Sequence, residues 1–156
     1  MEHFGGNCNN TEIAIMNILE MERVLNVPIK HARSLRKISV CNSPFEACSL
    51  LFGLIKNCVA LVKEVHHMQN IDLSRNSFQI SGDELLYAYE HAQSENLNVI
   101  GIFHSHFFGT KPSDKDLTYM EINPVIWLIY SVSECQFGAY VMENTLQEVV
   151  VEIIKE

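Results

Sequence analysis

The sequence has little positive charge. It contains 11 lysines and arginines against 19 aspartates and glutamates, which gives a formal net charge of −8 and a pI of about 5.3. The longest basic stretch, residues 30–37, is short. Because a protein that binds nucleic acid needs a basic surface to offset the phosphate charge, we expect no nucleic-acid partner.

The marks of secreted and membrane proteins are also missing. The five cysteines include no C-x-x-C pair and their number is odd, so they predict neither a disulfide framework nor a zinc knuckle. No segment reaches the eighteen or so apolar residues of a membrane span, and no basic stretch precedes the first apolar run. We therefore expect a cytoplasmic protein with no membrane partner.

The chain has enough apolar residues for one core. Its 156 residues are 47% hydrophobic, which suits a single domain that folds without disulfides. After a polar stretch rich in glycine and asparagine, Thr11 is placed to cap a short helix with Ile13, Met16 and Leu19 on its apolar side. We interpret residues 1–22 as an N-terminal extension and residues 23–156 as the folded domain.

The hydrophobic pattern predicts more strands than helices. Pro28 marks the first strand as an edge strand, residues 66–76 form a polar loop, and Leu85, Leu86, Tyr89 and Ala92 face inward from a helix. Expected strands are 24–29, 48–55, 58–65, 78–80, 99–103, 125–132, 137–142 and 148–154; expected helices are 31–42, 81–96 and 113–122. The mixed order predicts an α+β fold, a three-layer α-β-α sandwich on a mixed, largely antiparallel sheet.

Two histidines stand two residues apart at the end of an apolar strand. They are His104 and His106, in the stretch GIFHSHFFGTKPSDKD of residues 101–116. Alternation along a strand puts both rings on the same face, where they could hold one metal ion. The pair alone fits two ordinary strand-end histidines equally well.

Ser113 and Asp116 follow shortly after the pair. Ser-x-x-Asp after a proline is typical of a helix capping box, which is its plain structural interpretation. Because the helix would begin only seven residues beyond His106, its first turn can also bring the Asp116 carboxylate beside the two imidazoles. Two histidines and one carboxylate leave a position open for water, as in catalytic zinc sites. Iron(II) uses similar ligands, but its oxygenases need further open positions and a co-substrate site, so zinc is favoured.

A hydrolytic zinc site also needs a base that is not a ligand. Glu46, in the stretch SPFEACSLLFG of residues 43–53, precedes a strand too apolar to accept a carboxylate without a purpose. Glu46 is therefore our candidate base, and the alternative is a solvated loop residue.

Taken together, the two stretches resemble the JAMM (MPN-plus) metalloprotease family, whose fold is cytidine-deaminase-like. They occur in the family's order, a Glu segment, then His-Ser-His, then Pro-Ser-x-x-Asp, and the resemblance runs from about residue 24 onward. It implies that His104, His106 and Asp116 bind one Zn²⁺, that Glu46 is the general acid and base, and that Ser113 hydrogen-bonds the tetrahedral intermediate. Residues 23–156 would then be the catalytic domain.

Three features depart from the family's pattern. Phe107 replaces a proline, Ser49 stands where glycine is common, and nine residues rather than ten separate His106 from Asp116. The shorter loop could move the Asp116 carboxylate, although Gly109 gives the loop freedom to adjust. Asp114 is the alternative third ligand.

The resemblance implies a peptidase that cuts after the C-terminal Gly-Gly of a ubiquitin-like modifier. The short region after Asp116 suggests a minimal, prokaryotic-type member that acts on small ubiquitin-like or sulfur-carrier proteins. One alternative keeps the chemistry and trims the C-terminus of a sulfur-carrier protein, and another is a non-catalytic scaffold. We expect the substrate tail to bind along a strand edge near residues 66–80.

Overall fold

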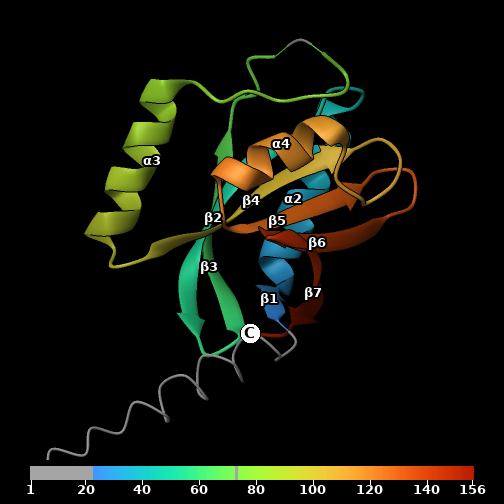
Figure 1. The fold of residues 1–156 in the computed structure, drawn as a ribbon. Coiled ribbons are helices and arrows are strands. Elements are labelled where there is room, and N and C mark those ends of the chain that lie inside the picture. Colours follow the sequence, from blue (N-terminus) through green and yellow to red (C-terminus); the bar gives the residue numbers. More distant parts are fainter. Residues whose placement is uncertain (1–22, 73) are drawn as a thin grey trace, which may run out of the picture.

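The computed structural model describes residues 23–72 and 74–156 (Figure 1). Their strands are β1 (Val24–Pro28), β2 (Cys48–Lys56), β3 (Val59–Met68), β4 (Asn98–His106), β5 (Ile126–Ser131), β6 (Gln136–Glu143) and β7 (Thr145–Ile154); their helices are α2 (Ile29–Asn42), α3 (Gly82–Ser94) and α4 (Asp114–Ile122). The helix expected within residues 1–22 lies outside the described residues. None of the helices described is long and apolar enough to cross a membrane.

The seven strands form one sheet that closes on itself, in the order β1-β3-β2-β4-β5-β6-β7. Pairs β1–β3, β1–β7 and β4–β5 are parallel, and the other four are antiparallel. The α+β class and the mixed sheet are thus as expected; the sheet is closed, and the expected three-layer α-β-α sandwich is not confirmed. β1 causes the closure because it pairs on both sides, and Pro28 stands at its last position, where a missing amide disturbs the pairing least.

The helices nevertheless cover both faces of the sheet. Ala32 and Leu35 of α2 share one apolar cluster with Leu51 of β2, whereas Leu50 and its neighbour Phe52 pack on α3 from the opposite face. α4 packs on the same face as α3, through Met120, Trp127 and Ile129. This double cover explains the continuous apolar run at the start of β2, whose first six residues are all buried.

Three local expectations are wrong. β3 continues to Met68, so residues 66–68 belong to a strand and not to a loop, because Cys48 of β2 pairs with Met68. Residues 78–80 form no strand with any part of the chain that the structure describes. On α3, Leu86 and Tyr89 are exposed, whereas the small side chains of Ala88 and Ala92 allow the helix to approach the sheet closely.

Candidate metal centre

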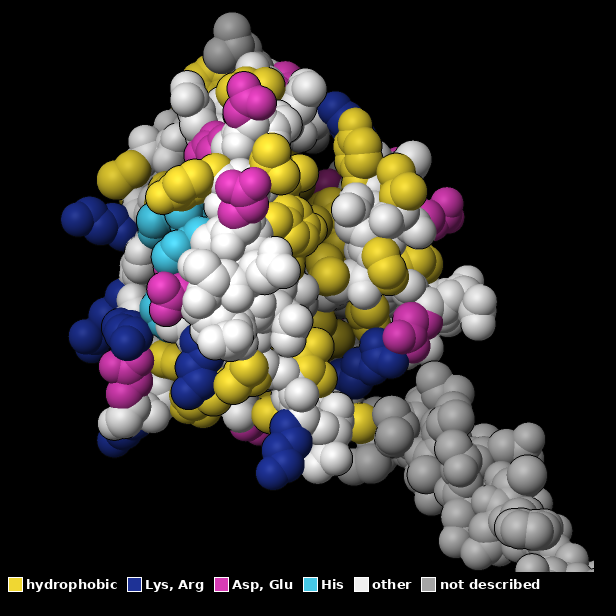
Figure 2. Space-filling model, turned by 90° about the vertical axis from the view of Figure 1, so that its left-hand side faces the viewer, with side chains coloured by type: hydrophobic (Ala, Val, Ile, Leu, Met, Phe, Trp, Pro, Cys, Tyr) yellow, Lys and Arg dark blue, Asp and Glu magenta, His cyan; other side chains and the backbone are white. Residues whose placement is uncertain are grey.

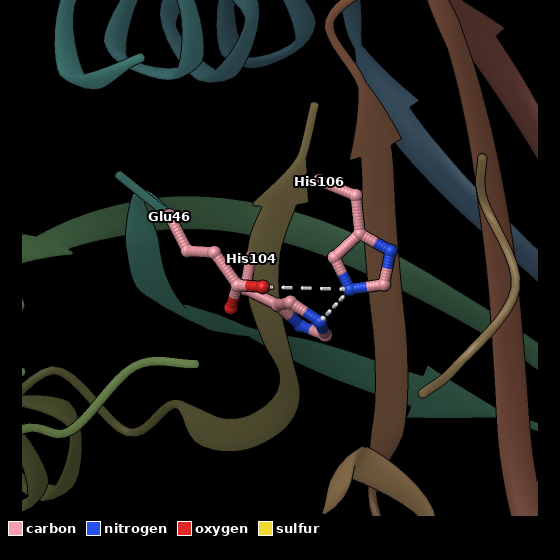
Figure 3. A group of neighbouring side chains, drawn as sticks. All are labelled: Glu46, His104 and His106. Carbon is pink, nitrogen blue, oxygen red and sulfur yellow. Dashed lines mark hydrogen bonds and ion pairs between the residues drawn. The ribbon is translucent and has the colours of Figure 1, made fainter. Parts of the chain in front are cut away.

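The pairing of β2 with β4 places Glu46 opposite His106. Cys48 pairs with His104 in the antiparallel register, and two bonds extend this pairing beyond the start of β2. The Ser105 amide donates to the Ala47 carbonyl at 3.0 Å, and the Ala47 amide donates to Ser105 Oγ at 2.9 Å. Figure 3 shows the Glu46 carboxyl group and both imidazole rings directed toward one another.

The two histidines converge as their alternation predicts. Their Nε2 atoms lie 3.0 Å apart, with His104 fully buried and His106 partly exposed. Phe78 stacks on the His104 ring at a centroid distance of 4.9 Å, and Trp127 meets it edge-on at 5.8 Å. The site therefore has an apolar wall on one side and opens to solvent near His106.

Asp116 joins the two histidines through the first turn of α4. Its Oδ2 lies 3.1 Å from His104 Nε2 and 3.2 Å from His106 Nε2. Ser113 is the N-cap of α4, and the reciprocal hydrogen bonds of a capping box link it to Asp116. The structure thus brings together the residues expected as ligands, and Asp114, the alternative, is exposed.

The loop between His106 and Asp116 is one residue shorter than the family's pattern, and its turn at Gly109 compensates for this. Gly109 has a φ of +79°, in the left-handed region that favours glycine, and its amide donates to Ser131 Oγ at 3.1 Å. This turn returns the chain to the strand end, so the shorter loop does not displace the Asp116 carboxylate.

The pKa values of the site reflect burial and close charges. Burial raises the pKa of Glu46 from 4.5 to about 7, although the nearby His106 opposes the shift. Burial lowers the pKa of His104; at His106 the same effect is outweighed by Asp116 and Glu46, which raise its pKa. Asp116 is also buried, but hydrogen bonds with both rings hold the pKa of its carboxyl well below the usual range. The site therefore favours an ionised Asp116 beside a Glu46 that can exchange a proton near neutral pH.

The spacing of His104, His106 and Asp116 fits a small metal ion. Tetrahedral zinc with bonds of 2.0–2.1 Å keeps its ligand atoms about 3.3 Å apart, and the three atoms here are separated by 3.0, 3.1 and 3.2 Å. Glu46 also forms a compact group with the two histidines. Its Oε1, however, lies 3.8 Å from His106, farther than Asp116 from either ring, so Asp116 is the better third ligand.

Two buried atoms of the site lack hydrogen-bond partners among the described residues. Glu46 Oε2 is one of them, which leaves this oxygen ready to accept from a bound water or substrate. His104 Nδ1 is the other, so this ring lacks the second hydrogen bond that usually orients a metal-bound histidine. Stacking on Phe78 takes over that orienting role.

Sequence patterns did not identify two residues that shape the site. Ser105 ties the segment before β2 to β4, and its position between two same-face histidines could have indicated that it points toward the opposite side. Phe78 stacks on a histidine 26 positions away, and no local pattern signals this contact.

Comparison with known proteins identifies the family. A family model for prokaryotic homologs of the JAB domain matches residues 28–144, a span that includes Glu46, both histidines and Asp116. The chain is 38% identical over 128 residues to a desampylase from Pyrococcus furiosus. The aligned region covers 80% of this chain and 87% of that protein. The solution structure of a protein from Desulfitobacterium hafniense has the same fold, with a TM-score of 0.76 and 23% identity over 85% of this chain and 94% of that one. This protein therefore belongs to the prokaryotic JAB-domain family, as its resemblance to JAMM proteins predicts.

Proposed function

We propose that this protein is a zinc-dependent isopeptidase that hydrolyses the bond after the C-terminal Gly-Gly of a ubiquitin-like modifier. The observation that carries the proposal is the convergence of three ligand atoms within 3.2 Å, beside a buried Glu46 oxygen that has no partner in the described chain. The similarity to a protein named desampylase supports the same class of substrate.

His104, His106 and Asp116 would hold the metal. Bound there, zinc polarises the scissile carbonyl and lowers the pKa of a water molecule to roughly 7. The apolar wall of Phe78 and Trp127 keeps bulk water from the buried side of His104. Ionised Asp116 balances part of the cation's charge, and its capping box keeps the carboxylate oriented toward the rings.

Glu46 would carry the proton. Its carboxylate accepts a proton from the attacking water while the water oxygen bonds to the Gly carbonyl carbon. When the C–N bond breaks, Glu46 delivers that proton to the departing amine. The modifier then ends in a free carboxylate. Burial raises the pKa of Glu46, which favours acceptance of the proton in the first half of this transfer.

Ser113 would stabilise the negative charge that develops on the carbonyl oxygen. Its Oγ accepts a hydrogen bond from the Asp116 amide at 3.2 Å, which leaves its O–H free to donate. A donor fixed by a helix cap does not need to reorganise when charge develops, which is the condition for effective stabilisation.

The modifier's extended tail would bind beside residues 77–80. In the described chain the backbone of Phe78 and of Ile80 makes no hydrogen bond. These groups can pair with a tail by strand addition.

An apolar pocket adjoins this segment. The pocket lies between α3 and α4, has a volume of about 380 Å³, and is lined by Phe78, Ile80, Leu85, Tyr89 and Trp127 among others. Figure 2 shows hydrophobic side chains lining a hollow on the face that carries α3. Because Phe78 contacts both the pocket and His104, an apolar tail residue could bind there while the Gly carbonyl reaches the metal centre.

A paired cleavage assay tests the proposal. One substrate is a Gly-Gly-ending modifier joined to a lysine side chain, and the other is the same modifier extended by a single amino acid. Preferential release from lysine, abolished by a zinc chelator and restored by added zinc, supports the isopeptidase. Preference for the single-residue extension supports a peptidase of sulfur-carrier proteins. Cleavage of neither substrate by the zinc-loaded protein contradicts both activities and favours the scaffold.

A further inference from the structure

We infer that Asn70 is a positioning residue that holds Glu46 and the tail-binding segment 77–80 in one arrangement, an inference that rests on the function proposed above. Asn70 lies two residues beyond the end of β3 and is partly buried. No pattern in the sequence marks it, since a single asparagine in a polar segment usually lies in an ordinary turn.

The amide nitrogen of Asn70 connects the backbone of Glu46 to the segment 77–80. Its Nδ2 donates to the backbone carbonyl of Glu46 at 2.8 Å and to that of Ser77 at 3.3 Å. Glu46 precedes β2, and its own carbonyl is held by no other bond in the described chain. Asn70 therefore fixes the backbone from which the Glu46 side chain extends.

The amide oxygen of Asn70 folds the loop that carries Phe78. Its Oδ1 accepts from the backbone amides of Asp72 at 2.9 Å and of Gln79 at 3.0 Å, and the Ile71 amide adds a bond to the Gln79 carbonyl at 2.8 Å. These bonds occupy one edge of the segment at Gln79. The backbone groups of Phe78 and of Ile80 make no hydrogen bond in the described chain, so they stay available to a substrate tail.

The chemistry of these partners settles the orientation of the Asn70 side chain. Both groups near Nδ2 are carbonyls, and both groups near Oδ1 are amides, so a flipped side chain would face four like groups. All hydrogen-bonding positions of the amide are used. A residue that could only accept, or only donate, would keep one half of the arrangement and lose the other.

Two substitutions separate the bonds that Asn70 Nδ2 donates from those that Oδ1 accepts. Asn70→Asp keeps an oxygen for the Asp72 and Gln79 amides but sets a second oxygen against the Glu46 and Ser77 carbonyls. Asn70→Ala removes both sets of bonds. Ser74→Ala, in the same loop, is the matched control, because Ser74 is exposed and its hydroxyl accepts only from the Asn76 amide.

Steady-state cleavage of the lysine-linked modifier by the zinc-loaded variants gives the first result. For Asn70→Asp we expect kcat to fall by about 10- to 100-fold, the usual cost of a misplaced catalytic group, with KM within about threefold of wild type. For Asn70→Ala we expect the same loss in kcat and a KM raised by about tenfold, because the segment that binds the tail is released. Ser74→Ala should match wild type. A wild-type kcat in Asn70→Asp would overturn the inference, as would equal losses in Asn70→Asp and Ser74→Ala.

Amide hydrogen exchange at Asp72 and Gln79 requires no substrate or metal. We expect exchange at both amides to rise by about five- to tenfold in Asn70→Ala, the factor that corresponds to a hydrogen bond of ~1 kcal/mol, and to stay near wild type in Asn70→Asp. Unchanged exchange in Asn70→Ala would overturn the role of Asn70 in the loop even if the wild-type protein cleaves nothing. The absence of all cleavage by wild type would instead refute the proposed function.

Discussion

The backbone amide of Ser113 donates to Oδ2 of Asp116 at 2.8 Å, and this same oxygen faces the ring nitrogens of both candidate histidine ligands. The Asp116 carboxylate therefore belongs to the helix cap and is also the third candidate ligand. The cap fixes the direction of the oxygen before any metal arrives, so less ordering is needed on binding.

Replacing Ser113 tests this double role. Ser113→Ala removes the hydroxyl that caps α4, which should reduce the free energy of unfolding by about 1 kcal/mol. It also removes the proposed donor to the carbonyl oxygen, so kcat should fall by about 10²-fold. Thermal unfolding and cleavage assays measure the two effects.

Ser81→Ala is the matched control for that substitution. Ser81 caps α3 by accepting from the Glu84 amide, so its loss should lower stability by a similar amount with kcat unchanged. Equal kcat losses in the two variants would show that Ser113 acts only through stability.

Glu46→Gln should retain zinc and lose cleavage. Glutamine keeps the size of the side chain but cannot accept and return the proton, so kcat should fall by about 10²- to 10⁴-fold. Zinc content and kcat are measured on the same preparation. Glu90→Gln, an exposed glutamate on α3, should behave as wild type, and undiminished turnover in Glu46→Gln would refute its role.

Glu46 should make the metal-free protein less stable as the pH rises from about 4.5 to about 7. Because the pKa of Glu46 is raised from 4.5 to about 7 on folding, this carboxyl group binds more protons in the folded state than in the unfolded state within this window, and its contribution to the unfolding free energy falls. Denaturant unfolding at several pH values with chelator present measures the slope. Glu46→Gln should flatten this part of the profile; an identical profile in both proteins would argue against the raised pKa.

Phe78→Ala should weaken substrate binding more than zinc binding. The change removes a wall of the apolar pocket and the ring stacked on His104, so KM should rise by about tenfold, as expected for ~1.4 kcal/mol of lost contact. Tyr87→Ala, on the exposed side of α3, serves as control. A KM equal to that of wild type would show that the pocket does not bind the substrate tail.

The sequence predicts the centre better than the architecture around it. Alternation along a strand is a local rule, and it correctly put His104 and His106 on one face. The Ser-x-x-Asp pattern is also local, and it correctly located the start of α4 at Ser113. Asp116 could be predicted to meet both rings because only a short loop separates it from His106.

Long-range pairing accounts for what the sequence did not predict. Closure of the sheet depends on β1 meeting β3 and β7, which are far apart in sequence, and Pro28 alone suggested an edge strand. Residues 66–68, two of which are histidines, join a strand because β2 offers them a partner. The hydrogen bonds of Asn70 likewise join segments that only the folded sheet brings together.

The metal content of the purified protein tests the central claim most directly. Mass spectrometry should find one zinc per chain in wild type and in Glu46→Gln, and none in His106→Ala, because we propose His106 as a ligand and Glu46 as the base. Circular dichroism of each variant verifies that it is folded. A folded wild-type protein that binds no zinc, or a His106→Ala variant that keeps it, would contradict the account.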